Sequence, residues 1–347
     1  MTLQRERNRV FPAAGLILLL IALLFGCIIL ATATGAVRVP YSVVTRILLN
    51  KLPLLQFAEW ENAQEIIILT IRLPRVLLAV LIGGGLAITG ATLQALFRNP
   101  MADPGVIGVS SGAALAAVIA ISSGTVLRHY LILPFSAFMG ALGTLFLVYA
   151  IATRQGRTPM ATLLLSGIAV GIFMGSILSL ILTRVSSIAA FREIFFWLMG
   201  GLDGRGWDHL KIAVWPILIG TVGLFFFSRD LNLLMLEGEE GATALGMEVR
   251  SVQWVLLILS SLVTGAAVAF SGTVPFVGLI IPHIVRLIIG PDHRFLMVAS
   301  FLAGASLLVG ADLLARTLIA PEELRLGTIT SLMGVPFFLY LLRREIG

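Results

Sequence analysis

Long stretches without a charged residue divide this sequence, and they constrain its fold more than any other feature. They cover residues 10–37, 76–97, 104–127, 130–153, 158–183, 212–228, 251–285, 295–311 and 326–342. Each is long enough for an apolar helix to cross a bilayer, which takes about 17–25 residues. The chain is 58% hydrophobic and only 12% charged, about half the charged fraction of a soluble domain. Helices satisfy their own backbone hydrogen bonds in lipid, so an all-α polytopic membrane protein is expected.

One of these stretches is too long for a single helix. Residues 251–285 contain Gly and Pro in the segment from Ser271 to Pro275, and both residue types interrupt helices. A break there predicts ten transmembrane helices in one domain that spans residues 1–347. The predicted spans are 11–34, 72–97, 105–126, 131–152, 160–183, 210–228, 251–270, 274–290, 295–316 and 326–342.

The charges that flank the first span predict the orientation. Arg5, Arg7 and Arg9 precede it, and Arg38 alone follows it closely. The side richer in arginine faces the cytoplasm, and the first helix usually dominates. Both termini are therefore expected on the cytoplasmic side of the inner membrane. Counted over the whole chain, the basic residues divide equally between the two sides. The long run and the further spans argue against a cleaved signal peptide.

Three segments between spans are more than linkers. Val43–Leu55 and Ile188–Met199 mix apolar and charged residues at helical spacing, which predicts short helices lying at the outer membrane interface. Residues 229–250 are polar yet retain several leucines. We expect one or two helices there, pressed against another protein.

Small residues recur at helix-packing spacing. Gly167, Gly171 and Gly175 form one such series, and Gly108 and Gly112 another. Close backbone approach drives helix association in lipid, so these series indicate packing within one subunit, an interface between subunits or the smooth wall of a pore. The candidate path and gate residues on this span are Met160, Ala161, Thr162, Ser166, Gly167, Gly171 and Met174.

Two ionisable residues lie four positions apart near the end of the ninth span. Asp312 and Arg316 are functional candidates because charged groups inside a membrane are costly. One hypothesis makes Asp312 the proton site of a secondary transporter. The competing interpretation is a local ion pair.

Several chemistries are excluded or disfavoured by the residues present. Cys27 is the sole cysteine and the four histidines are scattered, so we expect neither a metal site nor a bound cofactor. Lys51 and Lys211 lie outside any phosphate-binding loop, so the chain is not expected to hydrolyse ATP by that route. Basic residues are dispersed, which argues against nucleic-acid binding. The spans contain no nucleophile–base pair, so no catalytic residue is predicted.

Eight short motifs together resemble the iron-chelate, haem and cobalamin uptake permeases of ABC importers. They are IRLPR at 71–75, GATLQ at 90–94, FRNPMADP at 97–104, GVSSGA at 108–113, WLMGG at 197–201, FVGLIIPHIVR at 276–286, GAS at 304–306 and AD at 311–312. Each is weak alone, but together they cover most of the chain from about residue 60 onward.

The resemblance implies a BtuC-like subunit that pairs with a second copy around a central translocation path, which the 160–183 span lines. It also implies two cytoplasmic ATPase subunits and a periplasmic substrate-binding protein as partners. By the same resemblance, Arg72 and Arg316 match arginines that are presented to the binding protein. The stretch that matches the ATPase-coupling helices contains Leu236, Glu237, Gly238, Glu239, Ala242, Leu245 and Gly246.

Two positions depart from the family pattern. Arg325 stands where a proline is usual, and this could add a charge for docking. Met160 and Ala161 stand where small hydroxyl residues are expected, so a hydrophobic gate is the better interpretation. The cargo, whether a ferric siderophore, haem or cobalamin, is not identified by these motifs.

Overall fold

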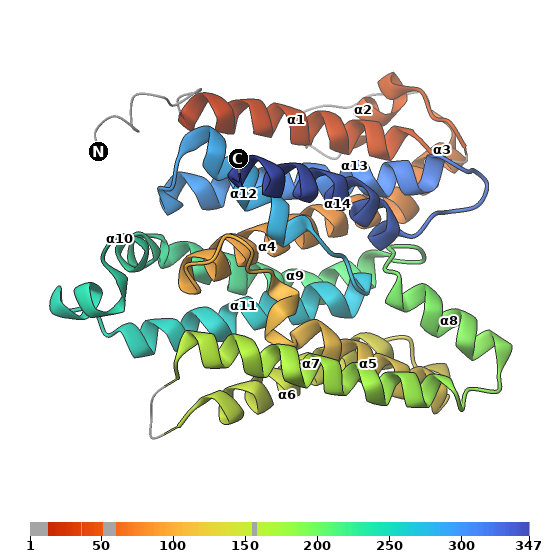
Figure 1. The fold of residues 1–347 in the computed structure, drawn as a ribbon. Helices are drawn as coiled ribbons and strands as arrows, with labels where there is room; N and C mark the ends of the chain where they lie inside the picture. Colours follow the sequence, from red (N-terminus) through yellow and green to blue (C-terminus); the bar gives the residue numbers. More distant parts are fainter. Residues whose placement is uncertain (1–12, 36, 51–59, 155–157, 347) are drawn as a thin grey trace.

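The computed structural model describes residues 13–35, 37–50, 60–154 and 158–346 as a bundle of helices (Figure 1). The N-terminal arginines and residues 51–55, which entered the predictions above, lie outside the described residues. The elements are α1 (Ala13–Ala33), α2 (Tyr41–Leu49), α3 (Asn62–Ile66), η2 (Ile67–Arg72), α4 (Leu73–Leu96), η3 (Pro104–Ile107), α5 (Val109–Ser122), η4 (Thr125–Arg128), α6 (Ile132–Ala152), α7 (Met160–Leu182), α8 (Ile188–Leu198), α9 (Trp207–Phe226), α10 (Ser228–Ala244), α11 (Val249–Ser271), α12 (Val277–Ile289), α13 (His293–Thr317) and α14 (Leu326–Ile346).

Seven helical stretches among the described residues are long and apolar enough to cross a bilayer. They are Ala13–Ala33, Asn62–Leu96, Ile132–Ala152, Met160–Leu182, Trp207–Phe226, Val249–Ser271 and His293–Thr317. Three shorter apolar helices, Val109–Ser122, Val277–Ile289 and Leu326–Tyr340, occupy the remaining three predicted positions. The all-helical fold is thereby confirmed, and ten crossings remain a prediction.

Helix α4 lies at the centre of the bundle and is held by glycines. It packs against α13, α12, α9 and α11. A Cβ atom on Gly83 would collide with the backbone of Gly304 in α13, and one on Gly90 would collide with the backbone of Gly278 in α12. These contacts are backbone against backbone, the approach that small residues permit between helices in lipid.

The break predicted at 271–275 is present, because α11 ends at Ser271 and α12 begins at Val277. Irregular backbone at membrane depth must be buried and hydrogen-bonded within the protein. The WLMGG motif provides partners: Gly201 N–H donates to the carbonyl of Ser271 at 2.8 Å, and Thr273 Oγ1 donates to the carbonyl of Leu198. Carbonyls of the same motif accept the N–H groups of Leu326 and Gly327 at 3.0 and 3.1 Å. The motif therefore joins the broken helix to the start of α14.

The bundle has two distinct ends (Figure 1). Helices α2, α3 and α8 gather at one, called here the α8 end, whereas α10 projects from the other, the α10 end. The short helices expected within 43–55 and 188–199 are present as α2 and α8, and their position at the membrane interface stays a prediction. Each buries one face, with Val44 and Ile47 of α2 and Ile194 and Trp197 of α8 turned inward.

Candidate functional site

Helix α10 is the most unusual element of the α10 end. It is broken at Gly238, whose backbone has φ 73° and ψ −173°, a conformation that essentially only glycine adopts. The prediction of one or two helices within 229–250 is thus confirmed, because helical pieces lie on both sides of Gly238. The break turns the second piece away from the bundle axis (Figure 1).

Residues at the end of α4 and in α11 contact the break in α10. Arg98 follows α4 with φ 49°, and its Nη1 would lie 3.1 Å from a Cβ atom on Gly238. On the other side, Gln253 of α11 donates to the carboxylate of Glu239 at 2.9 Å. The kink is therefore positioned by α4 and α11 together.

A polar cluster anchors the first piece of α10 to α13. Asn232 donates to the carboxylate of Asp292 at 2.8 Å and accepts the backbone N–H of His293 at 2.8 Å. Asp292 also caps α13 by accepting the N–H of Arg294 at 3.1 Å. His293 is fully buried, and its hydrogen bonds with Asn232 are partly buried, so they connect the first piece of α10 to the start of α13.

The turn at 97–104 that carries Arg98 is rigid, as the sequence predicts. Asn99 Oδ1 accepts the N–H of Met101 at 2.9 Å, and Asp103 Oδ1 accepts the N–H of Gly105 at 2.8 Å, which caps η3. Burial raises the pKa of the Asp103 carboxyl, and the hydrogen bond from Gly105 acts in the opposite direction.

The seven residues predicted to contact an ATPase divide into two groups. Leu236 and Leu245 are 76% and 67% exposed. Glu237, Glu239 and Gly246 are exposed as well. Gly238 is buried against Arg98, and Ala242 is fully buried. Both therefore take part in the packing of α10 itself, and contact with an ATPase stays a prediction for all seven residues.

Charged side chains form a buried cluster at the α8 end. Arg75 donates to Asp312 Oδ1 from Nε and Nη2 at 3.0 and 2.9 Å, and to the carboxylate of Glu323 at 3.1 and 2.9 Å. Arg316 Nε lies 3.0 Å from Oδ2 of Asp312, so the predicted local ion pair is present. Asp312 is only 1% exposed. Its charge is shared by two guanidinium groups, so ion pairing accounts for this buried carboxylate.

Arg72 and Arg316 are not presented at the surface as the docking prediction requires. They are 6% and 7% exposed. Arg72 donates to the carbonyls of Thr32 and Ala33 at 3.0 and 2.8 Å, and Arg316 donates to the carbonyl of Ala31 at 3.0 Å. The last carbonyls of a helix lack intrahelical partners and attract cations. Both arginines therefore tie the end of α1 to α4 and α13.

The predicted path residues lie on two different faces of α7. Ala161 and Thr162 are exposed, whereas Ser166 and Gly167 are buried. The buried face packs against α5 and α6: a Cβ atom on Gly108 would lie 3.1 Å from the carbonyl oxygen of Gly167, and Thr144 Oγ1 lies 3.4 Å from the sulfur of Met174. Gly171 and Met160 are half-buried. Packing within the subunit accounts for Ser166 and Gly167, which do not lie on an open wall.

The model of the FecCD transport family matches residues 19–344 of the chain. The chain belongs to the FecCD transport family. This FecCD permease is 49% identical over 293 residues to the cobalamin import permease BtuC of Halobacterium salinarum, with 84% of this chain and 77% of the relative covered. It is 43% identical over 280 residues to the hemin transport permease HmuU of Yersinia pestis, with 80% and 83% covered.

A solved structure agrees with this assignment. An ABC transporter of the metal-chelate type in an inward-facing conformation superposes on this FecCD permease with a TM-score of 0.83 and 31% identity. The match covers 95% of this chain and 99% of the solved one. The chain is accordingly a multi-pass membrane permease of an ABC importer family that handles iron chelates, haem or vitamin B12.

Proposed function

We propose that this FecCD permease moves a metal chelate, either a ferric siderophore, haem or cobalamin, from the periplasm to the cytoplasm. Two copies of the chain form the path across the inner membrane, with ten crossings each and both termini in the cytoplasm. Two separate ATPase subunits supply the energy and a periplasmic binding protein delivers the cargo. The relatives named above carry cobalamin and hemin, which supports this cargo class.

The projecting α10 is the observation that carries the proposal. Leu236 and Leu245 expose apolar side chains beside exposed glutamates on an element that leaves the bundle. Such a surface is suited to a protein partner rather than to lipid, because the glutamates would be costly in a bilayer. Helix α1 begins and α14 ends on the side of α10 (Figure 1), which supports a cytoplasmic position for all three.

The ATPase contact can be tested directly by changing this surface. The double variant Leu236→Asp and Leu245→Asp should fail to retain the ATPase subunits when the complex is purified in detergent. Leu127→Asp is the matched control, since Leu127 is 87% exposed in η4 at the opposite end. Equal ATPase recovery with both variants would refute the role proposed for α10.

For the path, we propose that Met160, Ala161 and Thr162 at the start of α7 form the cytoplasmic gate. Ala161 and Thr162 are exposed, and the preceding Met160 lines a cavity together with Glu239 and Glu240 of α10. Movement of α10 on the ATPase would then open or close this gate. Substitution of Ala161 by Trp should block uptake while leaving ATP hydrolysis by the complex intact, and undiminished uptake would contradict the assignment.

For docking of the binding protein, we propose that the buried cluster at the α8 end acts as a whole. Arg72, Arg75 and Arg316 outnumber the carboxylates of Asp312 and Glu323, so an excess positive charge remains there. Long-range attraction of this kind weakens with salt. Stimulation of ATP hydrolysis by the binding protein should therefore require more binding protein at high salt, and salt-independent stimulation would contradict this part.

A further inference from the structure

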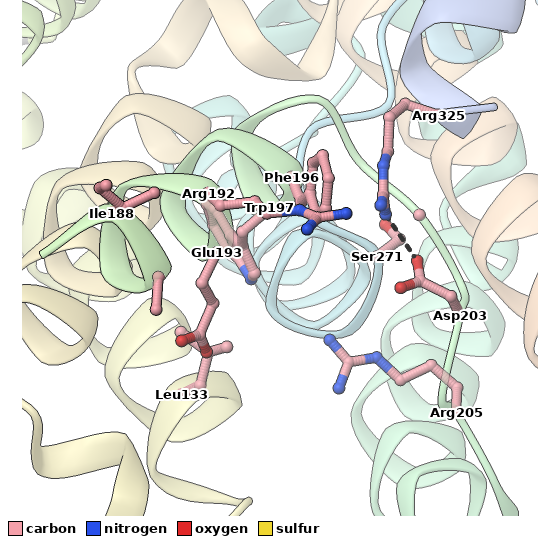
Figure 2. A pocket seen from close by; sticks show the side chains of 12 residues that line it. Leu133, Ile188, Arg192, Glu193, Phe196, Trp197, Asp203, Arg205, Ser271 and Arg325 are labelled. Atoms are coloured by element: carbon pink, nitrogen blue, oxygen red, sulfur yellow. Dashed lines mark hydrogen bonds and ion pairs between the residues drawn. The ribbon is translucent and has the colours of Figure 1, made fainter. Parts of the chain in front are cut away.

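A cavity of about 740 Å³ opens at the α8 end, and the functions proposed so far leave it unused. Helix α8 forms one side of it, and the chain that follows α8 forms the other (Figure 2). Ser271 at the break between α11 and α12 lies deep in it, and Arg325 reaches in from the start of α14. Its size is that of a site for a small molecule.

The cavity is lined by three guanidinium groups, those of Arg192, Arg205 and Arg325, and by two carboxylates, those of Glu193 and Asp203, so positive charge is in excess by one. The guanidinium groups of Arg192 and Arg325 both lie over the ring of Phe196, at 5.0 and 3.7 Å from its centroid. Arg325 is paired with Asp203 at 3.0 Å, whereas no ion pair of Arg192 is found among the described residues. Two like charges gathered at one aromatic ring repel each other, and an anion placed between them would relieve that repulsion.

Two further donors point to a ligand. Trp197 lines the cavity and is only 6% exposed, yet its buried indole Nε1–H has no hydrogen-bond partner among the described residues. A buried donor without an acceptor is costly, so such groups require an explanation. Arg205 uses Nε to donate to the carbonyl of Phe270 at 2.8 Å, and its remaining nitrogens extend toward the cavity (Figure 2).

We propose that this cavity binds a carboxylate of the cargo, and that the cargo is therefore an anionic, carboxylate-bearing chelate. A carboxylate accepts two parallel hydrogen bonds from a guanidinium group and a further one from an indole N–H. The inference rests on the transport function proposed above and narrows its substrate class. Arg192, Arg325 and Trp197 are the residues that would contact the carboxylate.

The depth of the cavity favours a small cargo over a side chain of the binding protein. Trp197 and Ser271 are 6% and 1% exposed, so a group that reaches them must enter below the surface of the bundle.

Binding to the purified full-length chain in detergent tests the cavity without any transport. We expect citrate, used as a probe tricarboxylate, to bind saturably by titration calorimetry. Arg192→Gln and Arg325→Gln should each weaken it about tenfold or more, because each removes a charge-assisted hydrogen bond. Arg128→Gln, an exposed arginine outside the cavity, should bind like the unaltered chain. Absence of saturable binding, or equal affinity in all three variants, would overturn the proposal.

Uptake by the complete complex in proteoliposomes tests the carboxylate site and the importer function separately. Ferric citrate or haem should be taken up in preference to cobalamin, and Arg325→Gln should remove that preference. ATP-driven uptake of cobalamin alone, unaffected by Arg325→Gln, would leave the importer function standing and sink the carboxylate site. No ATP-driven uptake of any chelate would sink the function. If Arg325→Gln impaired only the stimulation by unloaded binding protein, the occupant would be a protein side chain and the proposal would fall.

Discussion

The substitution Asp312→Asn tests whether the buried charges at the α8 end hold the bundle together. The change keeps the size of the side chain and removes its charge. Arg75 would retain Glu323 as its partner, 2.9 Å away. Arg316 would retain only backbone carbonyls, with its guanidinium still buried at 6% side-chain exposure.

The expected loss of stability follows from that burial. Removal of one partner from a buried ion pair costs about 3–5 kcal/mol, because the other charge is left in a medium that solvates it poorly. The lower end, about 3 kcal/mol, applies here since Glu323 still compensates Arg75. For a chain of 347 residues we expect the midpoint of thermal unfolding to fall by about 4 °C, since the unfolding entropy scales with chain length.

The chain offers its own reporter for this measurement. Cys27 is its sole cysteine and lies half-buried in α1, the helix whose end is held by Arg72 and Arg316. A fluorogenic thiol reagent would therefore follow the release of α1 during heating. Asp208→Asn is the control, because the pair of Asp208 with Lys211 is 3.8 Å long and largely exposed, and such pairs contribute little. An unfolding midpoint for Asp312→Asn equal to that of the control would refute the reasoning.

Other substitutions should separate packing from coupling. Gly90→Ala should lower the free energy of unfolding by roughly 1–3 kcal/mol, because the added Cβ meets the backbone of Gly278. Gly26→Ala, where a Cβ has nothing within 4 Å, should leave the unfolding midpoint unchanged. Gly238→Ala should lower the stability of the chain by about 1–3 kcal/mol through backbone strain and lower the ATPase activity of the complex. Unchanged ATPase activity would contradict a role of the kink in coupling. Asn232→Leu should increase hydrogen exchange in α10, measured by mass spectrometry, since the side-chain hydrogen bonds to Asp292 and His293 are lost; unaltered exchange would contradict that anchoring role.

The helical fold could be read from the sequence because lipid demands long apolar stretches. The break at Ser271–Pro275 was equally accessible, since glycine and proline sit in the middle of an overlong run. The bounds of α5 were not: the predicted span began at 105, but Asp103 caps a separate turn of helix at Pro104–Ile107 and Gly108 then adopts φ 82°. The α-helix therefore starts only at Val109.

The contacts of Arg72 and Arg316 could not be predicted from local sequence patterns. Motif position alone suggested that Arg72 and Arg316 face a partner. Their actual acceptors are carbonyls at the end of α1, distant in the sequence from both, and no spacing rule reveals such tertiary contacts. Arg75 was visible only as one arginine of the RLPR motif, with no sign that Asp312 would be its partner. At the cavity, the replacement of proline by Arg325 was the one available signal, and Asp203 and Arg192 carried none.

The course of α4 links the two ends of the molecule mechanically. This helix is about 36 Å long, at 1.5 Å per residue. The chain leaves it at Arg98, which touches the kink of α10, and enters it at Arg72 and Arg75, which hold the opposite ionic cluster. Its glycine contacts with α12 and α13 are too close for α4 to slide alone. We therefore expect α4, α12 and α13 to move together when α10 is displaced.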